Sequence, residues 1–310
     1  MNVLSLFDGI SCGQLALQNS NIKYDKYFAS EIDKHVISVT QKNFPNTIQV
    51  GDISNLGSKD FPKIDLLIGG SPCQGFSIAG KQLNFEDKKS KLFFEYLRIL
   101  KETKPTHFLL ENVSMKKEWI KIISDLLEVE PININSNLVS AQNRPRLYWT
   151  NIPNVTQPIN KNIELSSIVQ SQNDIIDYDK YLIPDTQLES LSKEVVFNGV
   201  FALTERRTEE AKRIRREYMK KYGKDFSPRR AKELFSRNDN KANCLTATIG
   251  KEHFIFDGQN IRYMTPIEWE RLQTLPDDFT SPISNSQRYK AIGNGWTADV
   301  ISHIFNNIQQ

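Results

Sequence analysis

Apolar runs alternate with amphipathic runs along residues 1–150, and this alternation restricts the fold more than any other feature of the chain. The apolar runs predict strands at residues 3–7, 27–30, 64–68, 107–110 and 147–150. The amphipathic runs predict helices at residues 13–18, 34–43, 91–103 and 116–127. Because strands that are separated by helices form largely parallel sheets, we expect an α/β fold with a mostly parallel, mixed sheet.

The alternation stops near Pro153. Residues 154–256 are rich in Asn, Ser and Gln and then strongly basic, so we expect a separate smaller domain or a long insertion there. Residues 1–153 and 257–310 would then form the main domain. Within its second part we expect a helix at 265–275, with Thr265 as N-cap and Pro266 in the first turn. A further apolar segment at 296–308 has helical spacing and should pack on the sheet.

Positive charge is concentrated in the middle of the chain. Residues 206–237 contain 13 Lys or Arg and 5 Asp or Glu, although the net charge of the whole chain is only +3. Such a segment is typical of a surface that binds a polyanion. An exposed helix with internal ion pairs to Glu209, Glu210 and Glu217 explains the segment equally well.

Three function classes are disfavoured by simple counts. No apolar run approaches the roughly 18 residues of a membrane span, and no basic segment precedes the first apolar residues as in a signal peptide. The three cysteines, Cys12, Cys73 and Cys244, are far apart and form no CxxC pair. This spacing argues against a disulfide framework or a structural zinc site, and we expect a cytoplasmic protein without a metal.

The loop after the first predicted strand, Phe7-Asp8-Gly9-Ile10-Ser11-Cys12-Gly13, places glycines where a ligand can approach a helix N-terminus. It is not the GxGxxG of dinucleotide-binding enzymes, which disfavours a nicotinamide dehydrogenase. Glu31 follows the second strand, at a spacing typical of an acid that binds ribose hydroxyls, and Asp52 falls near the end of a third. A nucleoside without phosphates fits this pattern, and S-adenosylmethionine is the common one.

Cys73 lies in Gly69–Ser77, GGSPCQGFS, directly after a buried strand. Pro72 fixes its own φ angle and the flanking glycines allow close approach of a flat substrate, which suits a nucleophilic thiol. An inert structural cysteine is the commoner case.

Two further motifs lie near predicted strands. Glu111 and Asn112 follow the strand at 107–110, at the same sheet edge as Cys73, where a carboxyl can serve as an acid. Arg144 and Arg146 alternate about a proline and could clamp a carbonyl and a phosphate. Each motif alone also has a non-catalytic explanation. Glu111 could be an acidic residue at the start of a helix, and the two arginines could form surface ion pairs.

Taken in order, the segments LFDGISCG, GGSPCQGFS, ENV, QNRPRLYW, EWERLQ and AIGNGW resemble the motif series of the DNA cytosine-5 methyltransferases over residues 1–153 and 257–310. The first loop and the Gly-x-x-Trp at 293–296 resemble the animal de novo enzymes more than typical restriction-system enzymes. Where this chain has Gly-Asn-Gly-Trp at 293–296, the family usually has Gly-Asn-small-Val. The resemblance implies a Rossmann-like class I methyltransferase fold with a smaller target-recognition domain at 154–256.

By this resemblance Cys73 attacks C6 of a flipped-out cytosine and Glu111 protonates or hydrogen-bonds N3. Arg146 would hold O2 of the base, Arg144 would support the phosphate or the Cys73 loop, and Asn112 would order the Glu111 loop. The expected cofactor is S-adenosylmethionine. The residues expected to bind it are Phe7, Asp8, Gly9, Ile10, Ser11, Cys12, Gly13, Glu31, Ile32, Asp52, Ile53, Ser71, Pro72, Asn294, Gly295 and Trp296.

The expected partner is double-stranded DNA. The residues expected to contact it are Gln74, Arg206, Arg207, Arg213, Arg215, Arg216, Arg229 and Arg230. Cys244-Leu245-Thr246-Ala247-Thr248 resembles the family's threonine segment at the end of the target-recognition domain. A cognate restriction endonuclease is possible, and restriction–modification, phage protection and orphan methylation all remain open, as does the oligomeric state.

Two other functions compete with DNA methylation. The first is methylation of tRNA cytosine, but the Cys-Phe-Thr segment of the eukaryotic tRNA enzymes is absent. The second is a catalytically inactive, DNA-binding regulator, but such relatives typically lose the Pro-Cys or Glu-Asn residues, and both pairs are present.

Overall fold

The computed structural model describes residues 1–71, 91–184, 188–189, 191, 195–226, 232–247 and 253–308. The first half of the chain contains a seven-stranded sheet. The strand order is β3-β2-β1-β4-β5-β7-β6. Its strands are β1 Asn2–Leu6, β2 Lys26–Ser30, β3 Ile48–Gln49, β4 Leu66–Gly69, β5 His107–Val113, β6 Ile132–Asn135 and β7 Pro145–Thr150. The first five are parallel and β7 runs antiparallel to both its neighbours, which confirms the predicted mixed α/β sheet. The short strand β6 was not predicted.

Strand β5 is longer than its apolar sequence indicates. It continues through Glu111 and Asn112 to Val113, because these residues pair with Tyr148, Leu147 and Arg146 of β7. Glu111 therefore lies within a strand and not in a loop after it. The antiparallel partner, which sequence periodicity does not reveal, supplies the extra backbone pairing.

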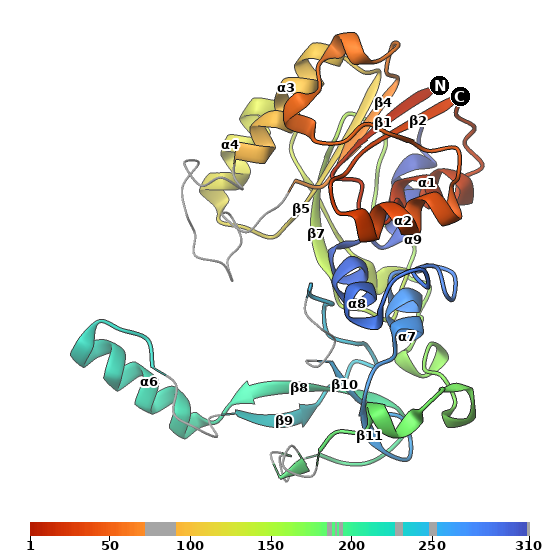
Figure 1. Cartoon of the computed structure of the whole chain (residues 1–310). Helices are drawn as coiled ribbons and strands as arrows, with labels where there is room; N and C mark the ends of the chain where they lie inside the picture. The colour runs from red at the N-terminus through yellow and green to blue at the C-terminus, as the bar shows by residue number, and fades with distance from the viewer. Residues whose placement is uncertain are drawn as a thin grey trace.

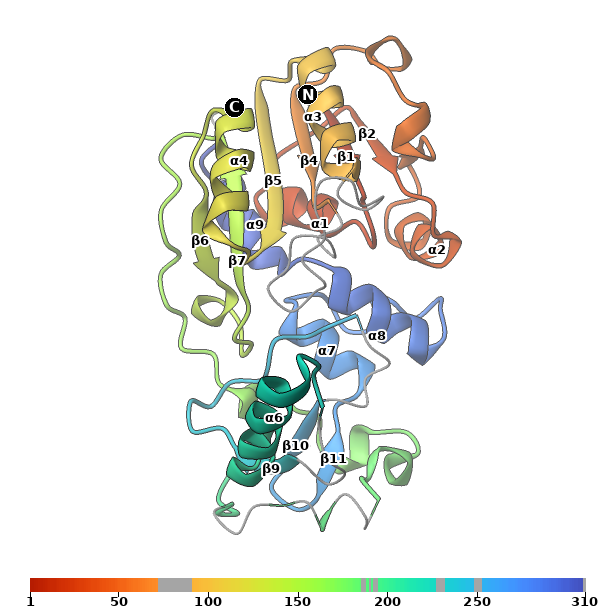
Figure 2. The ribbon, with the colours of Figure 1, turned by 90° about the vertical axis from the view of Figure 1, so that its left-hand side faces the viewer.

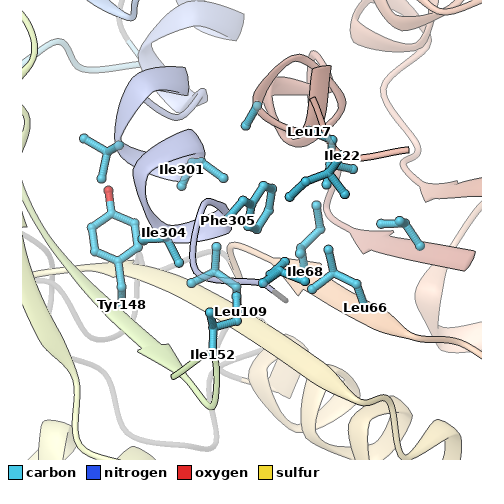
Figure 3. Close-up of a cluster of buried hydrophobic side chains, with 14 of the residues drawn as sticks. Leu17, Ile22, Leu66, Ile68, Leu109, Tyr148, Ile152, Ile301, Ile304 and Phe305 are labelled. Atoms are coloured by element: carbon cyan, nitrogen blue, oxygen red, sulfur yellow. The ribbon is translucent and has the colours of Figure 1, made fainter. Parts of the chain in front are cut away.

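Helices cover both faces of this sheet (Figures 1 and 2). They are α1 Cys12–Asn19, α2 Lys34–Asn43, α3 Lys91–Thr103, α4 Lys117–Leu127 and α9 Ala298–Phe305. Successive strand residues alternate between two cores, so that Leu109 faces the α1 and α9 side while Leu110 faces α3 and α4. Figure 3 shows the first core, where Ile301, Ile304 and Phe305 of the C-terminal helix pack on Leu66, Ile68 and Leu109.

A second sheet of four strands has the order β11-β10-β8-β9 and carries the helix α6. These elements are β8 Phe201–Arg207, α6 Glu209–Tyr222, β9 Lys232–Ser236, β10 Phe254–Phe256 and β11 Ile261–Tyr263. The expected boundary at residue 256 falls between β10 and β11, which are paired, so the second sheet extends to Tyr263.

Two helices, α7 Pro266–Leu272 and α8 Asn285–Asn294, lie between the two sheets (Figure 1). The N-terminus of α7 is fixed by the predicted cap: Thr265 Oγ1 accepts from the Glu268 backbone N–H, and Glu268 accepts in return from the N–H of Thr265. Trp269, Leu272 and Ile292 from these helices share a core with Ala202 and Ile255 of the second sheet. Among the helices that the structure describes, none is long and apolar enough to span a membrane.

Candidate active site

The carboxyl ends of β1, β4 and β5 meet at one edge of the first sheet, because the three strands are parallel and in register at Leu6, Gly69 and Leu110. The loop after β1, the residues Gly70 and Ser71 after β4, and Glu111 of β5 are therefore neighbours. Ligands of open α/β sheets bind at this edge.

Glu111 is held from two sides at this edge. Its Oε1 forms an ion pair with Nε of Arg146 at 3.0 Å, and its Oε2 accepts a hydrogen bond from the indole N–H of Trp296 at 3.1 Å. The side chains of Glu111 and Arg146 are each 12% exposed. A Cβ atom added to Gly70 would lie 3.0 Å from Oε2 of Glu111 and 3.0 Å from Nε1 of Trp296, so only glycine fits there without displacement. Three predicted site residues are thus brought together with a glycine of the Cys73 motif.

Asn112 connects β5 to the segment that leads to Cys73. Its amide nitrogen lies 3.4 Å from both the carbonyl and the hydroxyl oxygen of Ser71, and both residues are buried. The predicted role of ordering a Glu111 loop is wrong, because Glu111 is in a strand; Asn112 instead contacts Ser71. Pro72, Cys73 and Gln74 lie outside the described residues.

Arg144 is buried and bonded to backbone carbonyl groups. It is 3% exposed and donates to the carbonyl oxygens of Leu245 at 2.8 Å, Gly293 at 3.1 Å and Gly295 at 2.9 Å. Burial lowers the pKa of its guanidinium. These contacts show that Arg144 braces the C-terminal segment of the main domain against the segment that contains Cys244. Its predicted contact with a phosphate or with the Cys73 loop stays a prediction, because the Cys73 loop lies outside the described residues.

Cys244 lies between the two arginines. Its Sγ is 3.7 Å from Nη1 of Arg144 and 3.8 Å from both terminal nitrogens of Arg146. The sequence pattern did not indicate these contacts.

Glu31 fixes the loop after β1 through backbone contacts. Its Oε2 accepts from the N–H of Gly9 at 2.9 Å, and its Oε1 accepts from the N–H groups of Ile32 and Asp33 at 2.7 and 2.9 Å. A Cβ at Gly9, whose φ is +58°, would have no atom within 4 Å. The Ile32 side chain beside it is 73% exposed, which leaves an open apolar surface next to a carboxylate.

Asp8 lies in the same loop; the residue is partly exposed, but its Oδ2 atom is buried. Its Oδ1 accepts from the hydroxyl of Tyr27 at 2.8 Å, while Oδ2 has no hydrogen-bond partner within the described ranges. Burial raises the pKa of this carboxyl to about 6, although the hydroxyls of Ser5, Ser11 and Tyr27 act in the opposite direction.

The other predicted residues of this loop differ in what they present to a ligand. Phe7 is partly buried, whereas Ile10, Ser11 and Cys12 are buried, so that the last three can offer a ligand only backbone groups. Burial raises the pKa of the Cys12 thiol to about 12, which makes it inert at neutral pH.

Asp52 and Ile53 lie at the start of a short 3₁₀ turn, Ile53–Asn55. The carboxylate of Asp52 is exposed and accepts from the N–H of Ser54 at 2.9 Å, and Ile53 is buried. This contact shows Asp52 as an N-cap, with its second oxygen left for solvent or a ligand.

The turn at Gly293–Trp296 is held by a glutamine that the site prediction missed. Gln273 donates to the carbonyl oxygens of Ile292 and Gly295, both at 2.9 Å, and accepts from the hydroxyl of Thr297 at 2.7 Å. Gln273 is fully buried, so its amide must be hydrogen-bonded, but the polar helix end Glu270-Arg271-Leu272-Gln273 gives no sequence signal of this. The same turn packs on the first loop, since a Cβ at Gly295 would lie 3.4 Å from Sγ of Cys12.

Among the described residues, the arginines predicted to contact DNA lie in the second sheet and in α6. Arg206 lies over the ring of Phe235 in the second sheet, with 5.4 Å between Cζ and the ring centroid, and Arg207 ends β8. Arg213 and Arg215 form ion pairs within and beside α6. Arg229 and Arg230 lie outside the described residues.

The whole chain, residues 1–310, matches the family model of the C-5 cytosine-specific DNA methylases. The chain belongs to this family. It is 33% identical to the type II methyltransferase M1.ScrFI of Lactococcus lactis subsp. cremoris, over 97% of this chain and 76% of that protein. It is 31% identical to the type II methyltransferase M.SsoII of Shigella sonnei, over 99% and 79%. These matches confirm the prediction of an enzyme, a DNA (cytosine-5) methyltransferase.

The fold is similar to that of solved methyltransferases. The structure of the Entamoeba histolytica methyltransferase EhMeth superposes with a TM-score of 0.70 at 20% identity, covering 100% of this chain and 99% of that one. At this identity the match supports the predicted Rossmann-like methyltransferase architecture alone.

Proposed function

We propose that this enzyme transfers a methyl group from S-adenosylmethionine to C5 of a cytosine that is flipped out of duplex DNA, through a transient bond between Cys73 and C6. The observation that carries the proposal is the grouping of Glu111, Arg146 and Trp296 beside Gly70, three residues before Cys73 in the chain. This arrangement offers a carboxyl and a guanidinium side by side, which suits the N3 and O2 edge of a cytosine.

In the proposed reaction the thiolate of Cys73 forms a bond to C6, and the electron pair of the C5–C6 double bond moves into the ring. Glu111, which must first take up a proton from solvent, gives this proton to N3 to balance the charge, and Arg146 holds O2. C5 then takes the methyl group. Loss of the C5 proton to solvent, expulsion of the Cys73 thiolate and return of the N3 proton to Glu111 regenerate the enzyme and release 5-methylcytosine.

The loop after β1 fits S-adenosylmethionine. Glu31 is the acid at the ribose position, Ile32 offers an exposed apolar face to an adenine, and the unpartnered Oδ2 of Asp8 is a polar atom that a ligand could complete. Asp52 would border the adenine, and the turn at Asn294–Trp296 would close the methionine side. When bound, the cofactor supplies an electrophilic methyl group on a sulfonium. Trp296 then contacts both the cofactor region and Glu111.

The flipped base is required because C6 is inaccessible within a stacked duplex. A role in restriction–modification, phage protection or orphan methylation, a cognate endonuclease and a cytoplasmic location all remain predictions. Residues 154–256 are proposed to select the target sequence.

A methylation assay tests this proposal against methylation of tRNA. The purified chain is incubated with S-adenosylmethionine labelled in the methyl group and either unmethylated duplex DNA or tRNA, and the labelled nucleoside is identified after digestion. We expect 5-methyl-deoxycytidine from the duplex only, and none from a Glu111→Gln variant at the same enzyme concentration. Label confined to tRNA, or label on adenine, would overturn the proposal.

A further inference from the structure

The helix α6, Glu209–Tyr222, projects from the second sheet as an arm (Figure 1). It begins at Thr208, whose hydroxyl accepts from the N–H of Ala211 at 3.1 Å, and ends at Gly223, whose φ is 65°. Ala211 alone among the residues of this helix is buried. Because capping and surface contacts hold the arm, its outer side chains can be changed at little cost to the core.

One face of the arm is occupied by the chain that follows it. Tyr218 packs against Tyr222 with 4.6 Å between ring centroids and against Phe226 with 4.8 Å. Arg215 forms an ion pair with Asp225 from the same returning segment. Helical spacing places these residues on the side of Ala211, so this face is used within the arm.

The opposite face carries some cations that form ion pairs with glutamates of the same helix and others that do not. Lys212 pairs with Glu209, and Arg213 pairs with both Glu210 and Glu217, so these two charges are compensated. Arg216 and Lys220 are exposed and form no ion pair with any described carboxylate. They are four residues apart, about 6 Å along the helix axis, and lie on the same outward side.

We propose that the Arg216–Lys220 face of α6 lies against the sugar–phosphate backbone of the duplex and supplies affinity that does not depend on sequence. This inference rests on the proposed function, since it assumes a duplex DNA substrate. Two exposed cations one helical turn apart, without an ion-pair partner among the described residues, can each bind a phosphate of one strand, on which the charges follow about every 3.4 Å along the duplex axis. The arm has no Asn or Gln between Glu209 and Tyr222, so it lacks the amides that read adenine, and the comparison of unrelated duplexes below separates backbone contact from guanine recognition by Arg216 or Lys220.

The test measures binding alone, with no methyl transfer. Fluorescence anisotropy gives the dissociation constant of the full chain for several unrelated short duplexes over a range of salt concentrations. The Arg216→Gln/Lys220→Gln variant should bind all duplexes more weakly by roughly a factor of ten at low salt. The slope of log K against log salt should fall by about 1.8, or about 0.9 for each lost phosphate contact.

The matched control is Lys212→Gln/Arg213→Gln, which removes two cations of the same helix whose charges Glu209, Glu210 and Glu217 already compensate. Its slope should change by less than half as much, and both variants should keep the helical circular dichroism of the unaltered chain. An unchanged slope in the first variant, an equal change in both, or a loss restricted to some duplex sequences would each overturn the backbone assignment. Absence of salt-dependent duplex binding by the unaltered chain would overturn the proposed function together with it.

Discussion

Trp296 donates its indole N–H to Oε2 of Glu111 at 3.1 Å, across 185 residues of chain. This contact joins the turn that closes the predicted cofactor site to the strand that carries the predicted acid. Arg146 engages the other oxygen of the same carboxylate, so both Glu111 oxygens have fixed positions. The orientation of the proposed acid therefore depends on a segment at the far end of the chain.

Replacement of Trp296 by Phe tests this dependence. The variant keeps an aromatic ring but removes the N–H, and a hydrogen bond to a charged group contributes about 1.5 to 3 kcal/mol. We expect kcat to fall by roughly tenfold to a hundredfold, with a thermal unfolding temperature close to that of the unaltered enzyme. An unchanged kcat would show that the indole N–H does not orient Glu111.

Gly70 should tolerate no side chain. In Gly70→Ala the new Cβ would lie 3.0 Å from both Glu111 Oε2 and Trp296 Nε1, so the pair must separate. We expect activity to fall by at least about tenfold, in line with the loss of one charged hydrogen bond. Gly57→Ala is the control, because its Cβ would meet atoms only at 3.7 Å and beyond. Equal turnover by the two variants would contradict the packing argument.

Arg144, just before β7, and Arg146, within it, should separate stability from catalysis. Arg144→Met removes a donor from three carbonyl oxygens, of which that of Gly295 keeps Gln273, and should lower the free energy of unfolding by about 3 kcal/mol. Arg146→Gln should cost about 1 kcal/mol of stability but reduce kcat by roughly a hundredfold, since it removes the partner of Glu111. Urea denaturation and single-turnover kinetics measure both. The reverse pattern would show that the assigned roles are exchanged.

Asp8 should make stability depend on pH. Its pKa in the folded chain, about 6, lies above its ordinary value of 3.8, so the folded state holds the proton more tightly. Stability contributed by this group is therefore lost as the pH rises from about 4 to about 6. Asp8→Asn should match the unaltered chain below pH 4 and exceed it by about 2 to 3 kcal/mol at pH 7. Urea denaturation at several pH values checks this, and a variant that is less stable at pH 7 would refute the effect of burial.

The order of strands and helices in the main domain could be predicted because the apolar period changes from two to about 3.6 at each element. The cap of α7 was also readable, since Thr265, Pro266 and Glu268 form a local motif. The end of β5 could not be predicted from the sequence. Glu111 and Asn112 are polar, and only their pairing with β7 makes them strand residues.

Side-chain roles that depend on contacts between distant segments could not be predicted from the sequence pattern. The alternation of Arg144 and Arg146 indicated a shared side, and both do reach Cys244. It could not indicate that Arg144 is buried under Gly293 and Gly295, because those residues come about 150 positions later. In α6 the structure shows ion pairs for Lys212, Arg213 and Arg215, as one of the two alternatives predicted, whereas the polyanion-binding surface stays a prediction.

The bond between Cys73 and C6 is tested most directly with a duplex that carries 5-fluorocytosine at target cytosines. Fluorine cannot leave as a proton does, so the reaction should stop after methyl transfer. With S-adenosylmethionine present, we expect a denaturant-resistant protein–DNA adduct whose cross-linked peptide contains Cys73, and no adduct with Cys73→Ala. Efficient 5-methylcytosine formation by Cys73→Ala, or an adduct that maps to Cys12 or Cys244, would contradict the account.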